Sequence, residues 1–289
     1  MSIQKSELIL NKDGSIYHLN LLPEHISNTV IFVGDQDRVD QVTKHFDSIE
    51  FSIQKREFKT TTGVYKNNRL TVISTGIGPD NIDIVLNELD ALVNIDFKTR
   101  NIKKEHTALS IVRIGTSGSL QKDIAVDTFL MSDYALDLNG MLQAYEINSI
   151  GHPTIENAFI NHTNWSEKKA APLLISSSSG LSKKFNSPQI KAGITATAGG
   201  FYGPQGRVLR LALQDAHLNA KIDSFNYEGK RITNLEMETS AIYGLSKLLG
   251  HHAVSMNAIL ANRANGTFSK NPTEVVENLI VYTLKKLVE

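Results

Sequence analysis

The sequence contains no cysteine, no excess of charge of either sign and no long apolar run. Without cysteine the chain can form no disulfide, thiolate metal site or thiol nucleophile, which agrees with a reducing compartment. Thirty basic residues balance thirty acidic ones, so no long-range positive field attracts nucleic acids or anionic membranes. We therefore expect neither partner, and any bound anion must be held by local basic residues.

Neither a membrane helix nor a secretory leader is indicated. No apolar run reaches the ~18 residues that a membrane helix needs. Lys5, Glu7, Lys12 and Asp13 stand where a signal peptide would have its apolar segment, so we expect a cytoplasmic protein. With 289 residues, 41% of them hydrophobic, the chain can bury the core of one large domain or two small ones.

Short β-branched runs alternate with helical patterns. The pattern predicts strands at 29–33, 70–75 and 109–114, each followed by a turn that contains glycine. Helices are expected at 38–46 and at 235–249, the second with Gly250 as its C-terminal cap. Two more are expected, one that begins after an N-cap at Asp80 or Asn81 and one from Asn271 onward. Because parallel strands need helical crossovers, we predict a mostly parallel, helix-covered sheet with ligands at the carboxyl ends of its strands.

Three polar segments have ordinary interpretations. The serine run 176–179 is typical of a surface loop, and the basic segment 96–106 favours a solvated helix end or loop over a recognition patch. His251 and His252 have no metal-ligand spacing with a nearby acid, which favours helix-end or surface positions. We expect no metal site.

Two segments suit an anion. The turn from Gly34 to Arg38 combines a glycine, the start of a helix and a forked donor, although a plain turn is the simpler explanation of this segment alone. Arg113 ends an otherwise apolar strand, beside Thr116. Burying that charge is costly without a negative partner, which is either a bound anion or a structural carboxylate.

Two further segments suit a nucleoside. Glu236, Met237 and Glu238 are interpreted as the start of a helix; alternatively, a carboxylate there accepts both ribose hydroxyls while methionine contacts the sugar. In the second segment, Gln205 beside Arg207 matches the imide edge of uracil, whereas a surface loop is the simpler explanation.

Taken together, these segments resemble the uridine phosphorylase branch of the nucleoside phosphorylase superfamily. The matching strings, in chain order, are Tyr17-His18-Leu19, VGDQDRV, Arg56-Glu57-Phe58, STGIG, VRIGTSGSLQ, FYGPQGR, LEMETSA and Asn262-Arg263. The resemblance implies a single domain over residues 1–289, an α/β/α sandwich around a mixed, partly barrel-like sheet. It also implies phosphorolysis of uridine to uracil and ribose 1-phosphate, in a homodimer or homohexamer.

The resemblance also implies roles for individual residues. Phosphate is expected against Gly34, Arg38, Arg113 and Thr116, with Arg56 from a neighbouring subunit. Ribose is expected against Met237 and Glu238, with the neighbour's His18, and the base against Phe201, Gln205 and Arg207. Of these, Arg113, Glu238 and Arg207 are the candidate catalytic residues. Phosphate is a co-substrate and no cofactor is expected.

Departures from the family pattern fall at Gln36, where the family usually has proline, and at Pro79, where it has a second glycine. The family's monovalent-cation site would here involve Glu57 and Asn81, and we do not assert a cation. Segment 96–106 is an insertion relative to shorter members.

Two other functions compete with uridine phosphorolysis. A purine nucleoside phosphorylase or a nucleosidase would share the fold, but purine cleavage gains from an acid near N7, and residues 260–263 contain none. Hydrolysis would need no arginines around the neutral water nucleophile. A non-catalytic nucleoside-binding homologue should have lost key groups, and here they are all present.

Overall fold

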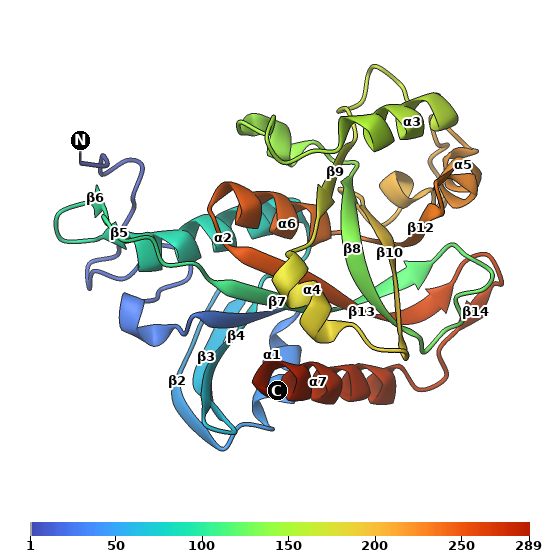
Figure 1. The fold of residues 1–289 in the computed structure, drawn as a ribbon. Helices are drawn as coiled ribbons and strands as arrows, with labels where there is room; N and C mark the ends of the chain where they lie inside the picture. The colour runs from blue at the N-terminus through green and yellow to red at the C-terminus, as the bar shows by residue number, and fades with distance from the viewer. Residues whose placement is uncertain (1) are drawn as a thin grey trace.

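The computed structural model describes residues 2–289, which are organised around one large sheet (Figure 1). Its longer strands are β1 (Thr29–Val33), β2 (Ser48–Lys55), β3 (Phe58–Tyr65), β4 (Asn68–Ser74), β7 (Ser110–Ser119), β8 (Phe129–Asp137), β10 (Ile190–Thr197), β12 (Lys230–Glu236) and β13 (His252–Asn262). Short strands are β9 (Leu173–Ser176), β11 (Asn226–Tyr227) and β14 (Thr267–Phe268), and β5 (Ile95–Asp96) pairs separately with β6 (Asn101–Ile102).

The helices are α1 (Gln36–Thr43), α2 (Pro79–Asn94), α3 (Pro153–Thr163), α4 (Ser179–Phe185), α5 (Leu218–Ser224), α6 (Thr239–Leu248) and α7 (Pro272–Val288), with short 3₁₀ turns at Pro23–His25, Met141–Ala144 and Gly203–Gln205. None of the helices within residues 2–289 combines the length and the apolarity that a membrane span requires.

The sheet is mixed and closes partly on itself. Its order is β11-β12-β10-β8-β13-β7-β1-β4-β3-β2, and β12 also pairs with β7. That extra pairing joins β7, β13, β8, β10 and β12 into a ring, through Leu235 opposite Gly118 and Asn234 opposite Ser119. β1 pairs in parallel with β4 and β7, whereas β13 and β8 pair with each other in antiparallel orientation. The partly barrel-like mixed sheet predicted from the resemblance is confirmed.

Helices cover both faces of the sheet because its central strands are apolar on both sides. On β1, Val30 and Phe32 pack in the core cluster that contains α2 and α6, while Ile31 and Val33 pack with α1 and α7. Successive side chains of a strand point to opposite faces, so a continuous apolar run produces the three-layer sandwich. Figure 1 shows α7 and α6 on different sides of the sheet.

The predicted strands and helices are present, with several boundary corrections. Gly78, not Asp80 or Asn81, is the N-cap of α2, because Pro79 suits the first helical position, where no N–H is needed. Residues 115–119, expected as a turn, continue β7 because they pair with β13 and β12. The helix expected from residue 235 begins at Thr239, since Leu235 and Glu236 are strand residues of β12. Gly250 follows α6 with a φ of 76°, as a C-terminal glycine should.

The polar segments also differ from their simplest interpretations. Segment 96–106 contains the small hairpin of β5 and β6 rather than a helix end. Arg100 donates to the backbone carbonyls of Ile3 and Gln4 near the N-terminus, so it serves the fold and is no recognition patch. The serine run is a loop only at 177–178, between the end of β9 and the start of α4.

Candidate active site

A cavity of about 490 Å³ lies where β1 and β12 end and beside the second half of β7. It brings together nine of the eleven residues predicted for the site: Gly34, Arg38, Arg113, Thr116, Phe201, Gln205, Arg207, Met237 and Glu238. These residues are spread over most of the chain. Carboxyl ends of strands are where α/β sheets bind ligands, so the fold explains why they meet here.

The turn after β1 presents a guanidinium with spare hydrogen-bonding capacity. Asp35 is the N-cap of α1: its Oδ1 accepts from Arg38 N at 2.9 Å. Arg38 Nη2 lies 3.4 Å from Asp35 Oδ2, and its Nε is buried without a partner among residues 2–289. Burial lowers the pKa of Arg38, while Asp35 acts in the opposite direction. An anion beside Nε would supply the missing partner.

Arg113 is buried in a cluster of opposite charge. Its Nη2 lies 2.6 Å from Glu238 Oε2 and 3.2 Å from Glu236 Oε2, and its Nη1 donates to Asn257 Oδ1 at 2.9 Å. Burial alone would lower the pKa of Arg113, but the two carboxylates outweigh it and hold the pKa above its ordinary value. Of the two partners that the sequence left open for Arg113, a structural carboxylate is therefore present. Arg113 nevertheless lines the cavity.

Gly115 makes room for that guanidinium. A Cβ placed on Gly115 would overlap Nη1 and Cζ of Arg113. Glycine at this position of the Arg-Ile-Gly-Thr motif is thus explained by the space that Arg113 occupies, and not by an unusual backbone conformation.

The two acids of the Glu-Met-Glu segment have different roles. Glu236 accepts hydrogen bonds from Thr197 Oγ1 at 2.6 Å and Thr239 Oγ1 at 2.8 Å, and so fixes the junction between β12 and α6. Glu238, the N-cap residue of α6, accepts from Gly78 N at 2.9 Å. Burial raises the pKa of Glu238, and the charge of Arg113 offsets part of that rise.

The sequence indicated Glu236 as a helix-start acid or as a carboxylate for the ribose, not as a residue that fixes a strand–helix junction, and it gave no role to Asn257. Glu236 had no clear local signal, because residues Lys230–Glu236 do not alternate between apolar and polar side chains. Asn257 has no local signal, since it reaches Arg113 only through the pairing of β13 with β7.

A second polar group, formed by Gln205 and Arg207, lines the same cavity. Arg207 Nη1 donates to Gln205 Oε1 at 2.7 Å and to Phe201 O at 2.6 Å, and its guanidinium lies 3.8 Å from the centroid of the Phe201 ring. Burial lowers the pKa of Arg207. The backbone carbonyl of buried Gln205 accepts from Arg263 Nη1 at 2.6 Å and from Asn219 Nδ2 at 3.1 Å. The amide is therefore held from both its main chain and its side chain.

His18 and Arg56 are absent from the lining of the cavity. His18 Nδ1 lies 2.6 Å from Glu88 Oε1, and the backbone carbonyl of Arg56 accepts from Gln36 Nε2 at 2.5 Å. Their predicted roles at a neighbouring subunit's site remain predictions. The candidate cation ligands Glu57 and Asn81 both approach Gly76, and Asn81 Nδ2 donates to Ile77 O at 3.2 Å.

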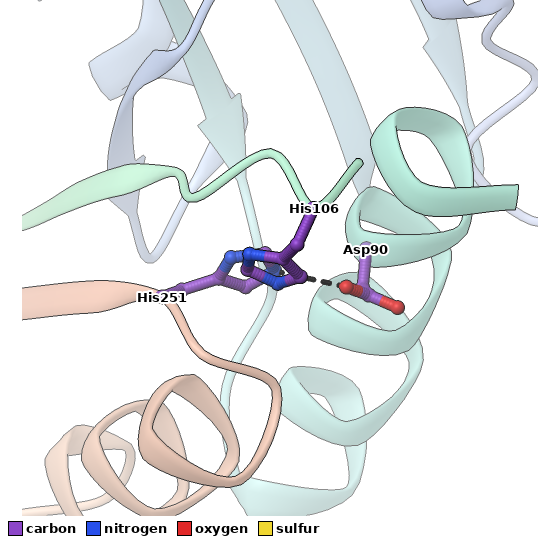
Figure 2. A group of neighbouring side chains, drawn as sticks. All are labelled: Asp90, His106 and His251. Carbon is purple, nitrogen blue, oxygen red and sulfur yellow. Dashed lines mark ion pairs between the residues drawn. The ribbon is translucent and has the colours of Figure 1, made fainter. Parts of the chain in front are cut away.

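His251 lies just after the end of α6, as expected for a helix-end position, and its backbone N–H donates to Ser246 O at 2.7 Å, but it is not on the surface. Its side chain is fully buried, and Figure 2 shows it beside Asp90 of α2 and His106, which are far from it in sequence. His251 Nε2 lies 3.3 Å from Asp90 Oδ1, without the alignment of a hydrogen bond. The three side chains meet because the loops before β7 and β13 start at the same edge of the sheet.

Hydrogen bonding around His251 disfavours a metal. Leu109 N donates to His251 Nδ1 at 3.2 Å, so the neutral ring carries its proton on Nε2, facing Asp90. A metal on Nε2 would require that proton on Nδ1, where it would oppose the N–H of Leu109. His106 Nε2 in turn donates to Leu249 O at 2.9 Å. The group is better described as a buried histidine–carboxylate contact than as a metal centre.

Comparison with known proteins decides the family. A family profile described as Phosphorylase superfamily matches residues 28–287. The chain belongs to this superfamily. As such it is a nucleoside phosphorylase family enzyme, a pentosyltransferase by family.

Named relatives of this phosphorylase include both uridine phosphorylases and purine nucleoside phosphorylases. It is 26% identical over 265 residues to uridine phosphorylase of Thermococcus kodakarensis, covering 90% of this chain and 82% of the relative. A crystal structure of a Trypanosoma brucei nucleoside phosphorylase, described as showing uridine phosphorylase activity, matches with a TM-score of 0.88 and 28% identity, over 98% of this chain and 99% of that one. A purine nucleoside phosphorylase of Listeria monocytogenes is 22% identical over 94% of this chain and 99% of the relative.

Proposed function

We propose that this enzyme cleaves uridine with inorganic phosphate, giving uracil and ribose 1-phosphate. The observation that carries the proposal is that one cavity is lined both by two arginines with a threonine and by an amide–guanidinium pair. Arg38, Arg113 and Thr116 suit the phosphate, and the amide–guanidinium pair of Gln205 and Arg207 suits the base. Met237 and Glu238 line the same cavity and suit the ribose.

Gln205 and Arg207 match a pyrimidine imide. Gln205 Oε1 accepts from Arg207, and its second lone pair remains for the N3–H of uracil. The Nε2 group of Gln205 and the remaining N–H groups of Arg207 can donate to the two carbonyl oxygens. Since Arg207 also stacks on Phe201, its plane is set before the base arrives.

The site lacks the acid that purine cleavage uses. Asn262 lies in the segment where purine-cleaving relatives are expected to have one, but its amide is buried and donates to Gln121 O and Ile124 O at 2.9 and 2.7 Å. No carboxylate occurs from Leu260 to Arg263. The similarity to purine phosphorylases makes purine cleavage the second candidate, and this segment argues against it.

The reaction is driven by the charge that develops as the glycosidic bond stretches. Ribose gains oxocarbenium character, phosphate attacks C1′ from the opposite face, and electrons move into the uracil ring. Arg207 and Gln205 stabilise that negative charge by charge-assisted hydrogen bonds, worth about 1.5–3 kcal/mol each, or roughly ten- to hundredfold in rate. Glu238 positions the ribose hydroxyls, while Arg38 and Arg113 hold phosphate for attack.

The test is release of uracil from uridine with and without phosphate, with inosine and adenosine in parallel. We expect phosphate-dependent cleavage of uridine, at least tenfold slower in Arg207→Ala. Arg210→Ala is the matched control, because Arg210 is exposed on the same loop and does not line the cavity. Preferred cleavage of inosine would indicate that purine nucleosides are the substrates. Cleavage without phosphate would show that phosphate is not the nucleophile.

A further inference from the structure

A second cavity, of about 520 Å³, lies at the opposite edge of the sheet from the candidate active site. It opens where β7 and β13 begin, next to the paired residues Ser110 and His252. Thr116 of the active-site cavity follows Ser110 by six residues along β7. At about 3.3 Å per residue, the two cavities are separated by about 20 Å.

Hydroxyl groups dominate the lining of this second cavity, and no acid of the described part of the chain, residues 2–289, belongs to that lining. Its serines are Ser110, Ser176, Ser177, Ser178, Ser179 and Ser246, and its other polar residues include Lys247 and His252. Ser246 is almost fully buried, and its Oγ has no hydrogen-bond partner within residues 2–289. We call this space the serine–lysine cavity. Its size is that of a small-molecule site.

Lys247 supplies the positive charge. Its Nζ donates to Ser176 Oγ at 2.6 Å, which leaves two of its three N–H groups for other acceptors. Partial burial lowers the pKa of Lys247, as expected for an ammonium group that lacks a close negative partner. On the other side of the serine run, His252 Nδ1 lies 3.4 Å from Ser178 Oγ. An acceptor with several oxygens and a negative charge would satisfy these groups together.

We propose that the serine–lysine cavity binds a phosphate group, either free or on a small ester. Phosphate oxygens accept hydrogen bonds from hydroxyl and ammonium groups alike, and no carboxylate lines the cavity to repel them. The binding site is separate from the phosphate position proposed beside Arg38 and Arg113. Its existence therefore does not depend on the reaction that the enzyme catalyses.

Equilibrium dialysis of the full chain with radiolabelled inorganic phosphate tests the proposal. We expect wild type to bind phosphate at two sites, and Lys247→Met to weaken one of them at least tenfold, the effect of losing a charge-assisted bond. Lys247→Arg should retain binding at that site. Lys183→Met is the matched control, because Lys183 is exposed on adjacent α4 and does not line the cavity. Thermal melting identifies any variant that fails to fold.

Arg38→Ala separates this site from the active site. In the Arg38→Ala background, phosphate binding that disappears with Lys247→Met supports the serine–lysine cavity even if uridine is not the substrate. Binding that is unchanged by Lys247→Met, in a folded variant, overturns the proposal. Competition by unlabelled ribose 5-phosphate distinguishes the two sources: displacement indicates an ester ligand, and no displacement indicates free phosphate.

Discussion

Replacing Gly115 with alanine tests whether the space around Arg113 is as tight as the structure shows. The new methyl group would overlap Nη1 and Cζ of Arg113 and lie about 2.7 Å from Nη2. The guanidinium cannot simply move aside, because it is buried and bonded to Glu238 at 2.6 Å and to Asn257 at 2.9 Å. One of these contacts must break or the strand must shift.

Overpacking of this kind lowers the free energy of unfolding by about 1–3 kcal/mol. In a domain of this size, that corresponds to a melting temperature lower by roughly 2–10 °C. Because displaced Arg113 would no longer hold phosphate in line, we also expect the KM for phosphate to rise at least tenfold. Differential scanning fluorimetry and initial rates at varied phosphate measure the two effects.

Gly180→Ala is the control for the change from glycine to alanine itself. A Cβ there meets no atom within 4 Å, and Gly180 lies inside α4, so unchanged or slightly higher stability is expected. If Gly115→Ala melts like wild type and retains the wild-type KM for phosphate, Arg113 is less constrained than we argue, and the steric explanation of Gly115 is wrong.

Three other predictions concern the charges of the site. Mixed oligomers of His18→Ala and Glu238→Gln should recover activity that neither variant has alone, if a neighbour supplies His18; absence of recovery would place His18 outside the site. For Glu238, burial raises the pKa, so the acid limb of kcat/KM for uridine should lie above the ordinary glutamate value of about 4.3, and Glu238→Gln should lack that limb. By linkage, the same raised pKa favours the folded state in acid, and this contribution is lost as pH rises through the folded pKa. Arg113→Met should lower the free energy of unfolding by about 3–5 kcal/mol, because it leaves Glu236 and Glu238 without their positive partner. The double variant Arg113→Met with Glu238→Gln should be more stable than the single variant and remain inactive. Chemical denaturation measures the stability of both variants.

Local signals were enough to predict the layers of the fold. The strand at Thr29–Val33 is a continuous β-branched and apolar run, and α7 has apolar residues at helical spacing with proline at its start. The boundary at residue 235 could not be predicted in the same way. Acids followed by apolar residues are typical of a helix start, but Leu235 and Glu236 are paired with β10, and this tertiary contact decides.

The same distinction applies to the candidate site: contacts within one short segment were predictable, and contacts between distant segments were not. Gly34 and Arg38 belong to one short segment with its own turn and helix start, so their proximity was predictable. The contacts of Arg113 with Asn257 and of His251 with Asp90 join residues that are distant in sequence, and only the strand order brings them together. Family resemblance supplied an expected role for Arg113, but it did not supply the buried partners that hold this side chain.

The Arg113–Glu238 ion pair connects the stability of the protein with its proposed chemistry. A guanidinium or a carboxylate buried alone would lose several kcal/mol of solvation, and here each compensates the other. The same pair joins the position proposed for phosphate to the position proposed for ribose. Because Gly78 N and Asn257 Oδ1 fix its two ends, a substrate would meet donors and acceptors that are already oriented. The contacts that stabilise these buried charges are therefore the same contacts that position the groups for the proposed reaction.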